Sequence, residues 1–292
     1  MLAVSAPNRE DERVNIRSVL LVVHPSRPAA AVLAEAAREW WERREVRVVE
    51  LGRIDEPGYL APGAFDLAVS LGGDGTMLRT VEVAFGGGVP IVGVNLGRMG
   101  YLTGVEPANM EAAFALVAAG EYQVEDRMAL EVEVRSADPT VGTLSYHALN
   151  EAIVERESHG HTIRVSVAIG GKTFLTYVAD GLLVCTPTGS TAYNLSARGP
   201  IVSPFMRAMV LTPIAAHLVF DRSLVLGPDE DVTLTMLDER KAALVLDGVG
   251  CLTLREGDSM TCRGASQPAR FVTFSERDFL AVLRSRFRLA DR

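Results

Sequence analysis

Short apolar runs alternate with stretches of helical periodicity in the first part of the chain. The runs at 19–23, 46–51, 65–71 and 90–95 have the length and composition of buried strands. Apolar residues recur with a helical period over 28–44, after residue 72 and over 107–120, where a glycine ends the segment. Strands that alternate with helices indicate a parallel sheet with helices on its faces. We therefore predict an α/β domain over 17–121.

The periodicity changes after about residue 122. Segments such as ALEVEVRS (129–136), TIRVSVAIGG (162–171) and DVTLTML (231–237) alternate apolar and polar residues, which favours strands with one buried face. Turns that contain glycine join several of these segments, as in AIGGKTF and LDGVGC. The pattern predicts a largely antiparallel, sandwich-like β domain over 122–274.

The two ends of the chain have patterns of their own. The segment 275–292 contains SERDFLAVLRSRFR, which predicts a helix with Ser275 as its cap, and we expect this helix to pack back on the first domain. Residues 1–16 include acidic side chains and no long apolar run, so we expect a flexible tail rather than a signal peptide.

Charge and cysteine usage narrow the choice of partners. A net charge of -8 argues against sequence-independent binding to nucleic acid, which needs a basic surface. No apolar run approaches the ~18 residues of a membrane span. The three cysteines are widely spaced and form no Cys-x-x-Cys pair, so neither a disulfide framework nor a zinc site is indicated. We expect a cytoplasmic protein with reduced thiols.

The sequence SLGGDGT (70–76) stands where a strand leads into a helix. In an open α/β sheet, ligands bind beyond the carboxyl ends of the strands. We expect Gly72, Gly73 and Gly75 to adopt positive φ and turn backbone N–H groups toward one point, with Thr76 adding a hydroxyl at the helix N-terminus. These groups together favour a phosphate.

Asp74 is the unusual member of this turn, because a carboxylate repels phosphate. With the amides holding a phosphoryl donor, Asp74 could act on the hydroxyl of an acceptor, which indicates phosphoryl transfer. The spacing alone leaves a second interpretation open, in which Asp74 only caps the helix. A P-loop is excluded at Gly171-Lys172-Thr173, because Ser166 occupies the place of its first glycine and the flanking strands predict a hairpin.

Three separated motifs resemble those of one family. GGDGT is shared by several kinase families, but DGLLVCTPTGSTAYNLSARGPIV (180–202) closely resembles the long signature of NAD kinases, and ALNEAIVER (148–156) resembles their Asn-Glu segment. The resemblance covers about 19–274 with the motifs in family order. It implies transfer of the terminal phosphate of ATP, or of polyphosphate in some members, to the 2′-hydroxyl of the adenosine ribose of NAD. It also implies a divalent metal, usually Mg²⁺, and a homo-oligomer, either a dimer or a tetramer.

The resemblance also implies roles for individual residues. Asp74 matches the proposed proton acceptor, and Asn150 and Glu151 match the pair that holds the adenosine half, where a carboxylate can accept from both ribose hydroxyls. Asp180 matches an aspartate near the nicotinamide end, and its alternative role is that of a turn residue. The dinucleotide contacts further include Gly72, Gly73, Gly75, Thr76, Arg79, His161, Thr191, Ala192, Tyr193, Asn194, Leu195 and Ser196.

Some positions depart from the family pattern. Many relatives have arginine at the position of Val178, glycine at that of Arg198 and glutamine at that of Val249. These departures affect the nicotinamide end of the site, where Arg198 could replace a lost positive charge. His217 could lie near the transferred phosphate or be an interior histidine.

Two other functions are compatible with parts of the sequence. A lipid kinase of the diacylglycerol or sphingoid type shares GGDGT and a two-domain plan, but the 180–202 signature argues against it. A non-catalytic dinucleotide-binding protein would keep the pocket without turnover. The presence of Asp74, Asn150 and Glu151 favours an enzyme.

Overall fold

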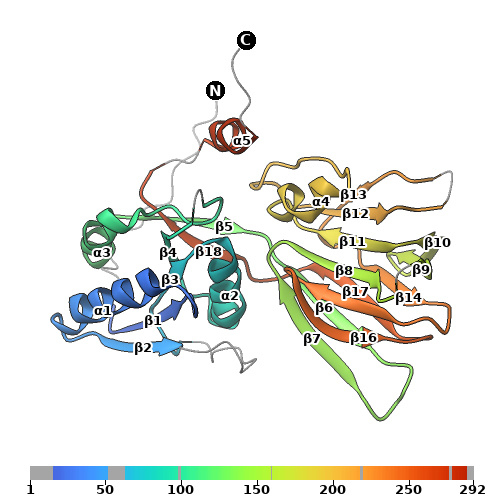
Figure 1. Ribbon diagram of the computed structural model, residues 1–292, viewed down its shortest axis with the longest axis horizontal. Coiled ribbons are helices and arrows are strands. Elements are labelled where there is room, and N and C mark those ends of the chain that lie inside the picture. Colours follow the sequence, from blue (N-terminus) through green and yellow to red (C-terminus); the bar gives the residue numbers. More distant parts are fainter. Residues whose placement is uncertain are drawn as a thin grey trace, which may run out of the picture.

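Two domains lie side by side in the computed structural model, with a helix near the C-terminus beyond them (Figure 1). The structure describes residues 16–51, 63–97, 100–158, 160–217, 220–275 and 278–287. The tail predicted over 1–16 lies outside the described residues, apart from Ile16. Within the described part, no helix is long and apolar enough to cross a membrane.

The first domain is a six-stranded sheet in the order β2-β1-β3-β4-β18-β5. The first four strands and β18 run parallel, and β5 is antiparallel to β18. Its strands are β1 (Ser18–Val23), β2 (Arg47–Leu51), β3 (Leu67–Gly72), β4 (Ile91–Asn95), β5 (Gln123–Arg127) and β18 (Ala269–Thr273). Its helices are α1 (Pro28–Glu42), α2 (Asp74–Ala84) and α3 (Met110–Ala119), with 3-10 turns η1 (Phe85–Gly87) and η2 (Pro107–Asn109). The predicted α/β architecture is confirmed.

Each face of this sheet has its own apolar core. Helix α1 begins with a proline at its first turn and buries Ala30, Ala34, Ala37 and Trp41, which repeat at helical spacing along one stripe. Together with α3 this stripe covers one face, whereas α2 covers the other with Met77 and Val81. Burying a side chain of this size contributes ~1.5–3 kcal/mol.

The first sheet extends further along the chain than the predicted domain limits of 121 and 274 suggest. Strand β5 follows residue 121, and β18 comes from the end of the segment expected in the second domain. Both nevertheless pair in the first sheet. The chain therefore crosses between the domains twice, after β5 and before β18.

The second domain packs two antiparallel six-stranded sheets face to face. One has the order β10-β9-β14-β17-β6-β7 and the other β13-β12-β11-β8-β15-β16. The strands of the former are β6 (Leu130–Arg135), β7 (Thr143–Ala148), β9 (Ile163–Ile169), β10 (Lys172–Ala179), β14 (Val232–Met236) and β17 (Ser259–Gly264). Those of the latter are β8 (Glu151–Arg156), β11 (Gly181–Cys185), β12 (Met209–Ile214), β13 (Leu224–Leu226), β15 (Ala242–Leu246) and β16 (Val249–Leu254). Both sheets contribute to one apolar core, which confirms the predicted sandwich.

Local signals at two turns can be compared directly with the structure. Gly170 and Gly171 have positive φ and join β9 to β10, so the segment around Lys172 is a hairpin, as predicted, and not a P-loop.

The predicted C-terminal helix forms as α5 (Phe279–Phe287). Its first amides donate to Asp278 Oδ1, so Asp278 is the cap and the assignment of this role to Ser275 was wrong. The packing of α5 on the first domain stays a prediction.

Candidate functional site

The turn after β3 needs glycine for close packing and not for positive φ. Gly72, Gly73 and Gly75 all lie outside the left-handed region, so the predicted role of positive φ was wrong. A Cβ on Gly72 would lie 2.6 Å from the Cβ of Thr76, whose side chain is buried against this turn. By contrast, a Cβ on Gly73 or Gly75 would meet nothing within 4 Å. These two glycines therefore border open space at the end of the strand.

The N-terminus of α2 opens onto the same space. Gly73 is the residue that precedes the helix, and no side chain caps the helix there. The first amides of a helix have no partners within the helix, and the helix dipole adds positive potential at this end. The turn therefore offers backbone donors to an anion, as the sequence predicted.

Asp74 is held by a neighbouring loop. Its Oδ1 accepts a hydrogen bond of 3.0 Å from the N–H of Leu102, and its Oδ2 accepts one of 3.2 Å from the N–H of Tyr101. The carboxylate therefore does not cap its own helix, and the alternative interpretation of Asp74 as a cap was wrong. Two amides fix its orientation, and a carboxylate with about four acceptor positions keeps some of them for a ligand.

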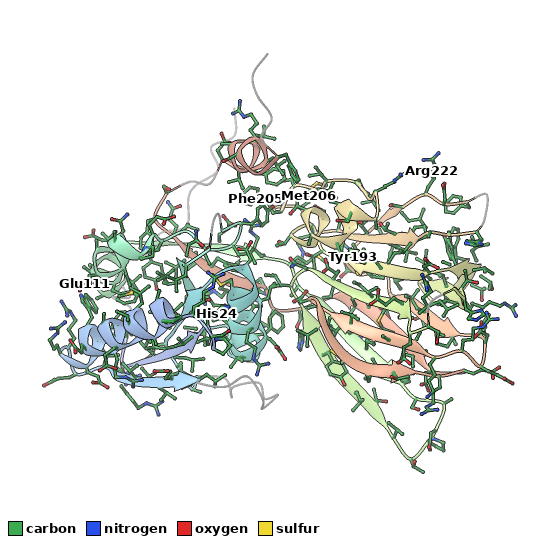
Figure 2. The ribbon with its side chains drawn as sticks, viewed as in Figure 1. His24, Glu111, Tyr193, Phe205, Met206 and Arg222 are labelled. Carbon is green, nitrogen blue, oxygen red and sulfur yellow. The ribbon has the colours of Figure 1, made fainter. Side chains whose placement is uncertain are left out.

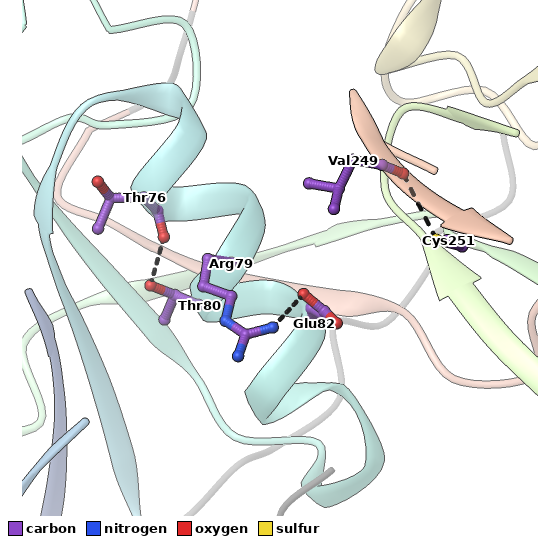
Figure 3. Close-up of polar contacts among 6 residues, drawn as sticks. All are labelled: Thr76, Arg79, Thr80, Glu82, Val249 and Cys251. Carbon is purple, nitrogen blue, oxygen red and sulfur yellow. Dashed lines mark hydrogen bonds and ion pairs between the residues drawn. The ribbon is translucent and has the colours of Figure 1, made fainter. Parts of the chain in front are cut away.

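Arg79 and Glu82 lie on the side of α2 that faces β16 (Figure 3). Arg79 lies on the second turn of α2, and its Nη1 is 2.7 Å from Oε2 of Glu82 (Figure 3). Val249 and Cys251 of β16 lie across from them (Figure 3). The charge of Glu82 contributes to a raised pKa of Cys251, although burial is the larger cause. Arg79 thus has a carboxylate partner within its own helix.

The Asn150–Glu151 turn is fixed from two sides. Asp247 accepts hydrogen bonds from the N–H groups of Leu149 and Asn150, both 2.7 Å, and from that of Glu151, 3.0 Å. On the other side, a Cβ on Gly189 would lie 2.7 Å from Cα of Asn150 and would overlap its carbonyl oxygen. Only glycine fits there, so the turn and the 186–191 loop form one unit.

Glu151 has an unusual environment for a carboxyl group. It is 4% exposed, and its Oε2 has no hydrogen-bond partner. Burial, with the charge of Asp247 as a second cause, raises the pKa of Glu151 to about 8. A buried polar atom without a partner is costly, which indicates that a ligand atom completes this site.

The segment that follows β11 has little regular structure. It forms a 3-10 turn η3 (Gly189–Thr191) and a single helical turn α4 (Tyr193–Ser196). Asn194 is fully buried and its amide is used by the fold, because Nδ2 donates to the carbonyls of Ser190 and Pro200 and Oδ1 accepts from Thr212. Thr191 is also buried, whereas Ala192 and Leu195 are partly buried and Tyr193 and Ser196 are exposed.

Asp180 lies at the other end of the same sheet. In the antiparallel pairing of β8 and β11, Glu151 is opposite Cys185 and Glu155 is opposite Gly181, which puts Asp180, five residues from Cys185, ~17 Å from the Glu151 end along the strand. Its carboxylate pairs with Arg156, with 2.8 Å between Nε and Oδ1. Burial, followed by the charges of Glu155 and Asp180, raises the pKa of the Tyr193 phenol.

The two histidines that the sequence singled out are both at the surface. His161 is exposed in the connection between β8 and β9, at the Arg156 end of β8. His217 is exposed after β12, where its N–H donates to the carbonyl of Val178, so it is not an interior histidine. The site thus divides into an Asp74–Glu151 end and an Asp180 end.

The departures from the family pattern have visible consequences. Arg198 has a φ of 64°, a left-handed conformation that favours glycine. An arginine at this position therefore lowers the stability of the fold relative to glycine. Val249 is 64% exposed and faces the space between the domains (Figure 3). Val178 lies on β10 next to the connection that follows β12.

A pocket beside the Asp74 turn was not predicted from the sequence. It has a volume of about 410 Å³ and is lined by Val23, His24, Pro25, Ser26, Arg27, Pro28, Ala31 and Glu50. The N–H of His24 donates to the carbonyl of Leu71, and the Arg27 guanidinium donates to the carbonyl of Leu96. The pocket therefore lies at the carboxyl end of β1, next to the end of β3.

One buried cluster ties the two parts of the site together. Leu149, next to the Asn150–Glu151 turn, packs in the same cluster as Met77 of α2 and Leu102, whose N–H holds Asp74. Among the described residues, no group of three or more His, Cys, Asp or Glu side chains could hold a metal ion. An acidic side chain beside an open helix N-terminus, with a buried acid on the neighbouring domain, is an arrangement that suits phosphoryl transfer from a nucleotide.

Comparisons with known proteins identify the family. Residues 58–122 match the ATP-NAD kinase N-terminal domain and residues 149–274 the ATP-NAD kinase C-terminal domain. The NAD kinase of Heliobacterium modesticaldum is 41% identical over 278 residues, which cover 92% of this chain and 98% of that protein. The NAD kinase of Wolinella succinogenes is 38% identical, with 95% and 97% covered. The chain belongs to the NAD kinase family, a family of phosphotransferases.

Solved structures agree with this assignment. Yeast NADH kinase, in complex with NADH, has a TM-score of 0.82 at 24% identity and shares the fold over 99% of this chain and 94% of its own. An NAD kinase from Archaeoglobus fulgidus, in complex with ATP, has a TM-score of 0.69 at 26% identity, with 92% and 98% covered. Neither a lipid kinase nor a non-catalytic binding protein is supported by these matches.

Proposed function

We propose that Asp74 accepts the proton of the 2′-hydroxyl on the adenosine ribose of NAD while the oxygen attacks the terminal phosphorus of ATP. The bond between that phosphorus and its bridging oxygen breaks, and ADP and NADP are the products. The observation that carries this proposal is the position of the Asp74 carboxylate, which two loop amides hold beside the open N-terminus of α2. General-base help of this kind is worth ~10²–10⁴-fold, and positioning supplies much of the rest.

The phosphoryl donor fits the first domain. We place its phosphates at Gly73, Gly75 and the first amides of α2, because these border open space and no side chain caps the helix. The adjoining pocket of about 410 Å³, with Arg27 and His24 in its lining, has room for the rest of a nucleotide. Substituting Arg27 with alanine is expected to raise KM for ATP more than KM for NAD.

The acceptor fits the second domain. Asn150 and Glu151 would hold the adenosine half beside Asp74, Tyr193 would contact the middle of the dinucleotide, and Asp180 would lie near the nicotinamide. The elongated arrangement of these residues suits a ligand with two nucleoside ends. Arg79, His161, Thr191, Ala192, Leu195 and Ser196 stay predicted contacts, and Asn194 would act by holding the turn.

A divalent metal would arrive with the donor. Mg²⁺ keeps several waters and is bound through one or two carboxylates together with substrate phosphates. Asp74, with acceptor positions left beside the proposed phosphate site, fits this limited role. The ion would neutralise charge on the transferred phosphoryl group.

Self-association has support from an apolar patch on the second domain. Ile201, Phe205 and Met206 are 44%, 55% and 53% exposed, and Figure 2 shows Phe205 and Met206 together at the edge of this domain. We propose that this patch lies in a homo-oligomer contact. The three free cysteines suit a reducing compartment, which supports a cytoplasmic location.

A coupled assay tests the function directly. NADP formation is followed with a dehydrogenase specific for NADP, while the donor is ATP or polyphosphate and the acceptor is NAD or NADH, with and without Mg²⁺. We expect NADP from ATP and NAD, and a loss of turnover when the metal is chelated. Binding of NAD without any NADP formation under all donors would contradict the proposal.

A further inference from the structure

Asp247 controls both the shape and the charge of the substrate turn. It lies with Gly248 in the tight connection between β15 and β16, where both residues have positive φ. Besides accepting three amide hydrogen bonds from 149–151, it donates its own N–H to the carbonyl of Glu151 at 3.0 Å. These four hydrogen bonds between two short segments fix the position of the Asn150–Glu151 turn.

The same arrangement places two carboxyl groups together at the junction. Each of the three hydrogen bonds from backbone amides requires an acceptor, so Asp247 is satisfied as a carboxylate. Glu151 has a buried oxygen, Oε2, without a hydrogen-bond partner. Within the described part of the chain it forms no ion pair. Of the two carboxyl groups, Glu151 is therefore the one whose protonated, neutral form is favoured by its surroundings.

The other titratable groups around this pair do not reverse that preference. Cys185 of β11 and Tyr193 of α4 face Glu151, and the pKa of each is raised, so both are neutral near pH 7. Glu82 of α2 and Cys251 of β16 lie near Asp247, and Glu82 adds negative charge. Burial raises the pKa of Asp247 to about 6 despite its three amide bonds, and that of Glu151 to about 8.

We propose that Asp247 is a positioning residue that keeps Glu151 in its neutral acid form, so that Glu151 Oε2–H donates a hydrogen bond to an uncharged acceptor atom of the nucleoside. This inference rests on the proposed function and deepens it. The sequence predicted a carboxylate that accepts from two ribose hydroxyls. The structure instead assigns Glu151 a donor role toward a hydroxyl oxygen, ring oxygen or ring nitrogen.

The donor role makes NAD binding depend on pH in a particular direction. NAD binds to the protein in which Glu151 is neutral. The affinity for NAD is therefore full below pH 8 and falls by about tenfold per pH unit above it. Binding near pH 8.5 must also take up a proton from solvent. Neither effect is expected from a carboxylate that only accepts hydrogen bonds.

Isothermal calorimetry of the full chain with NAD, between pH 6 and pH 10 and in buffers of different ionisation enthalpy, tests the proposal. We expect the break in affinity near pH 8 and proton uptake near pH 8.5 in the unmodified protein. Glu151→Gln, which donates but cannot ionise, should lose both and bind at least tenfold more tightly than Glu151→Ala at pH 7. The matched control Glu133→Gln changes a surface carboxylate on β6 and should keep the break.

The variant Asp247→Asn distinguishes an effect of Asp247 on the protonation of Glu151 from a purely structural role. Loss of its charge should move the break to lower pH, whereas a purely structural role would lower affinity equally at every pH. If this variant does not fold, the comparison of the unmodified protein with Glu151→Gln still decides the matter. A flat affinity profile, or the same break in Glu151→Gln, would overturn the inference. A chain that binds no NAD at any pH would instead contradict the proposed function as well.

Discussion

Gly189 lies directly against the backbone of Asn150, with no room between them for a side chain. This contact joins the loop that carries η3 and α4 to the turn that is proposed to hold the adenosine half. We expect Gly189→Ala to cost ~1–3 kcal/mol of stability through overpacking and to weaken NAD binding by more than tenfold. The control is Gly250→Ala on β16, where a Cβ meets nothing within 4 Å. Equal effects of the two substitutions on NAD affinity, measured by calorimetry, would contradict this view of the loop.

The buried acid at Glu151 should cost stability at alkaline pH. Its folded pKa of about 8 lies above its ordinary value of 4.5, so the folded state binds more protons between these values. The contribution of Glu151 to stability is therefore full below pH 4.5 and is lost as the pH rises toward 8. We expect Glu151→Gln to be more stable than the unmodified protein at pH 9 by on the order of a few kcal/mol. Thermal unfolding at pH 5 and pH 9 measures this, and a difference that does not grow with pH would refute it.

Arg198 offers a test of backbone strain after α4. Its left-handed φ of 64° costs ~1 kcal/mol relative to glycine. We expect Arg198→Gly to raise the free energy of unfolding by that amount and Tm by ~2–4 °C. Arg198→Ala keeps the strain while removing the guanidinium, so it should give no such gain. If alanine stabilised the protein as much as glycine, the guanidinium and not the backbone would be the cause.

Much of the fold follows from periodicity alone. The runs at 19–23 and 90–95 became β1 and β4 within one residue, because a buried parallel strand must be apolar on both faces. Pairing partners are a different matter. Strands β5 and β18 were not among the segments that the sequence predicted as strands, and both joined the first sheet.

The sequence predicted those candidate site residues that belong to side-chain motifs. It did not predict the contacts that backbone amides make. Asp74, Asn150 and Glu151 have recognisable motifs. Tyr101 and Leu102 act through their amides, more than twenty-five positions after Asp74, and leave no signature in the side-chain pattern. Asp247 likewise holds a turn almost a hundred residues away, so only the folded chain reveals that it sets the state of Glu151. Its Asp-Gly pair was visible only as a turn.

Asp66 provides a control for the central claim, because, like Asp74, it accepts hydrogen bonds from two backbone amides at one end of β3. Its Oδ2 accepts from the N–H groups of Arg17 and Ser18, both at 2.9 Å, and it stands before β3 whereas Asp74 follows the same strand. Asp66→Asn should therefore lower stability and leave kcat unchanged.

The most direct measurement is kcat for NADP formation in Asp74→Asn, compared with Asp66→Asn and the unmodified protein. We predict a fall in kcat of ~10²–10⁴-fold in Asp74→Asn, with little change in KM for NAD, because the base is lost and the nucleoside contacts are kept. Turnover of Asp74→Asn within a few-fold of the unmodified protein would show that this carboxylate does not act on the ribose hydroxyl.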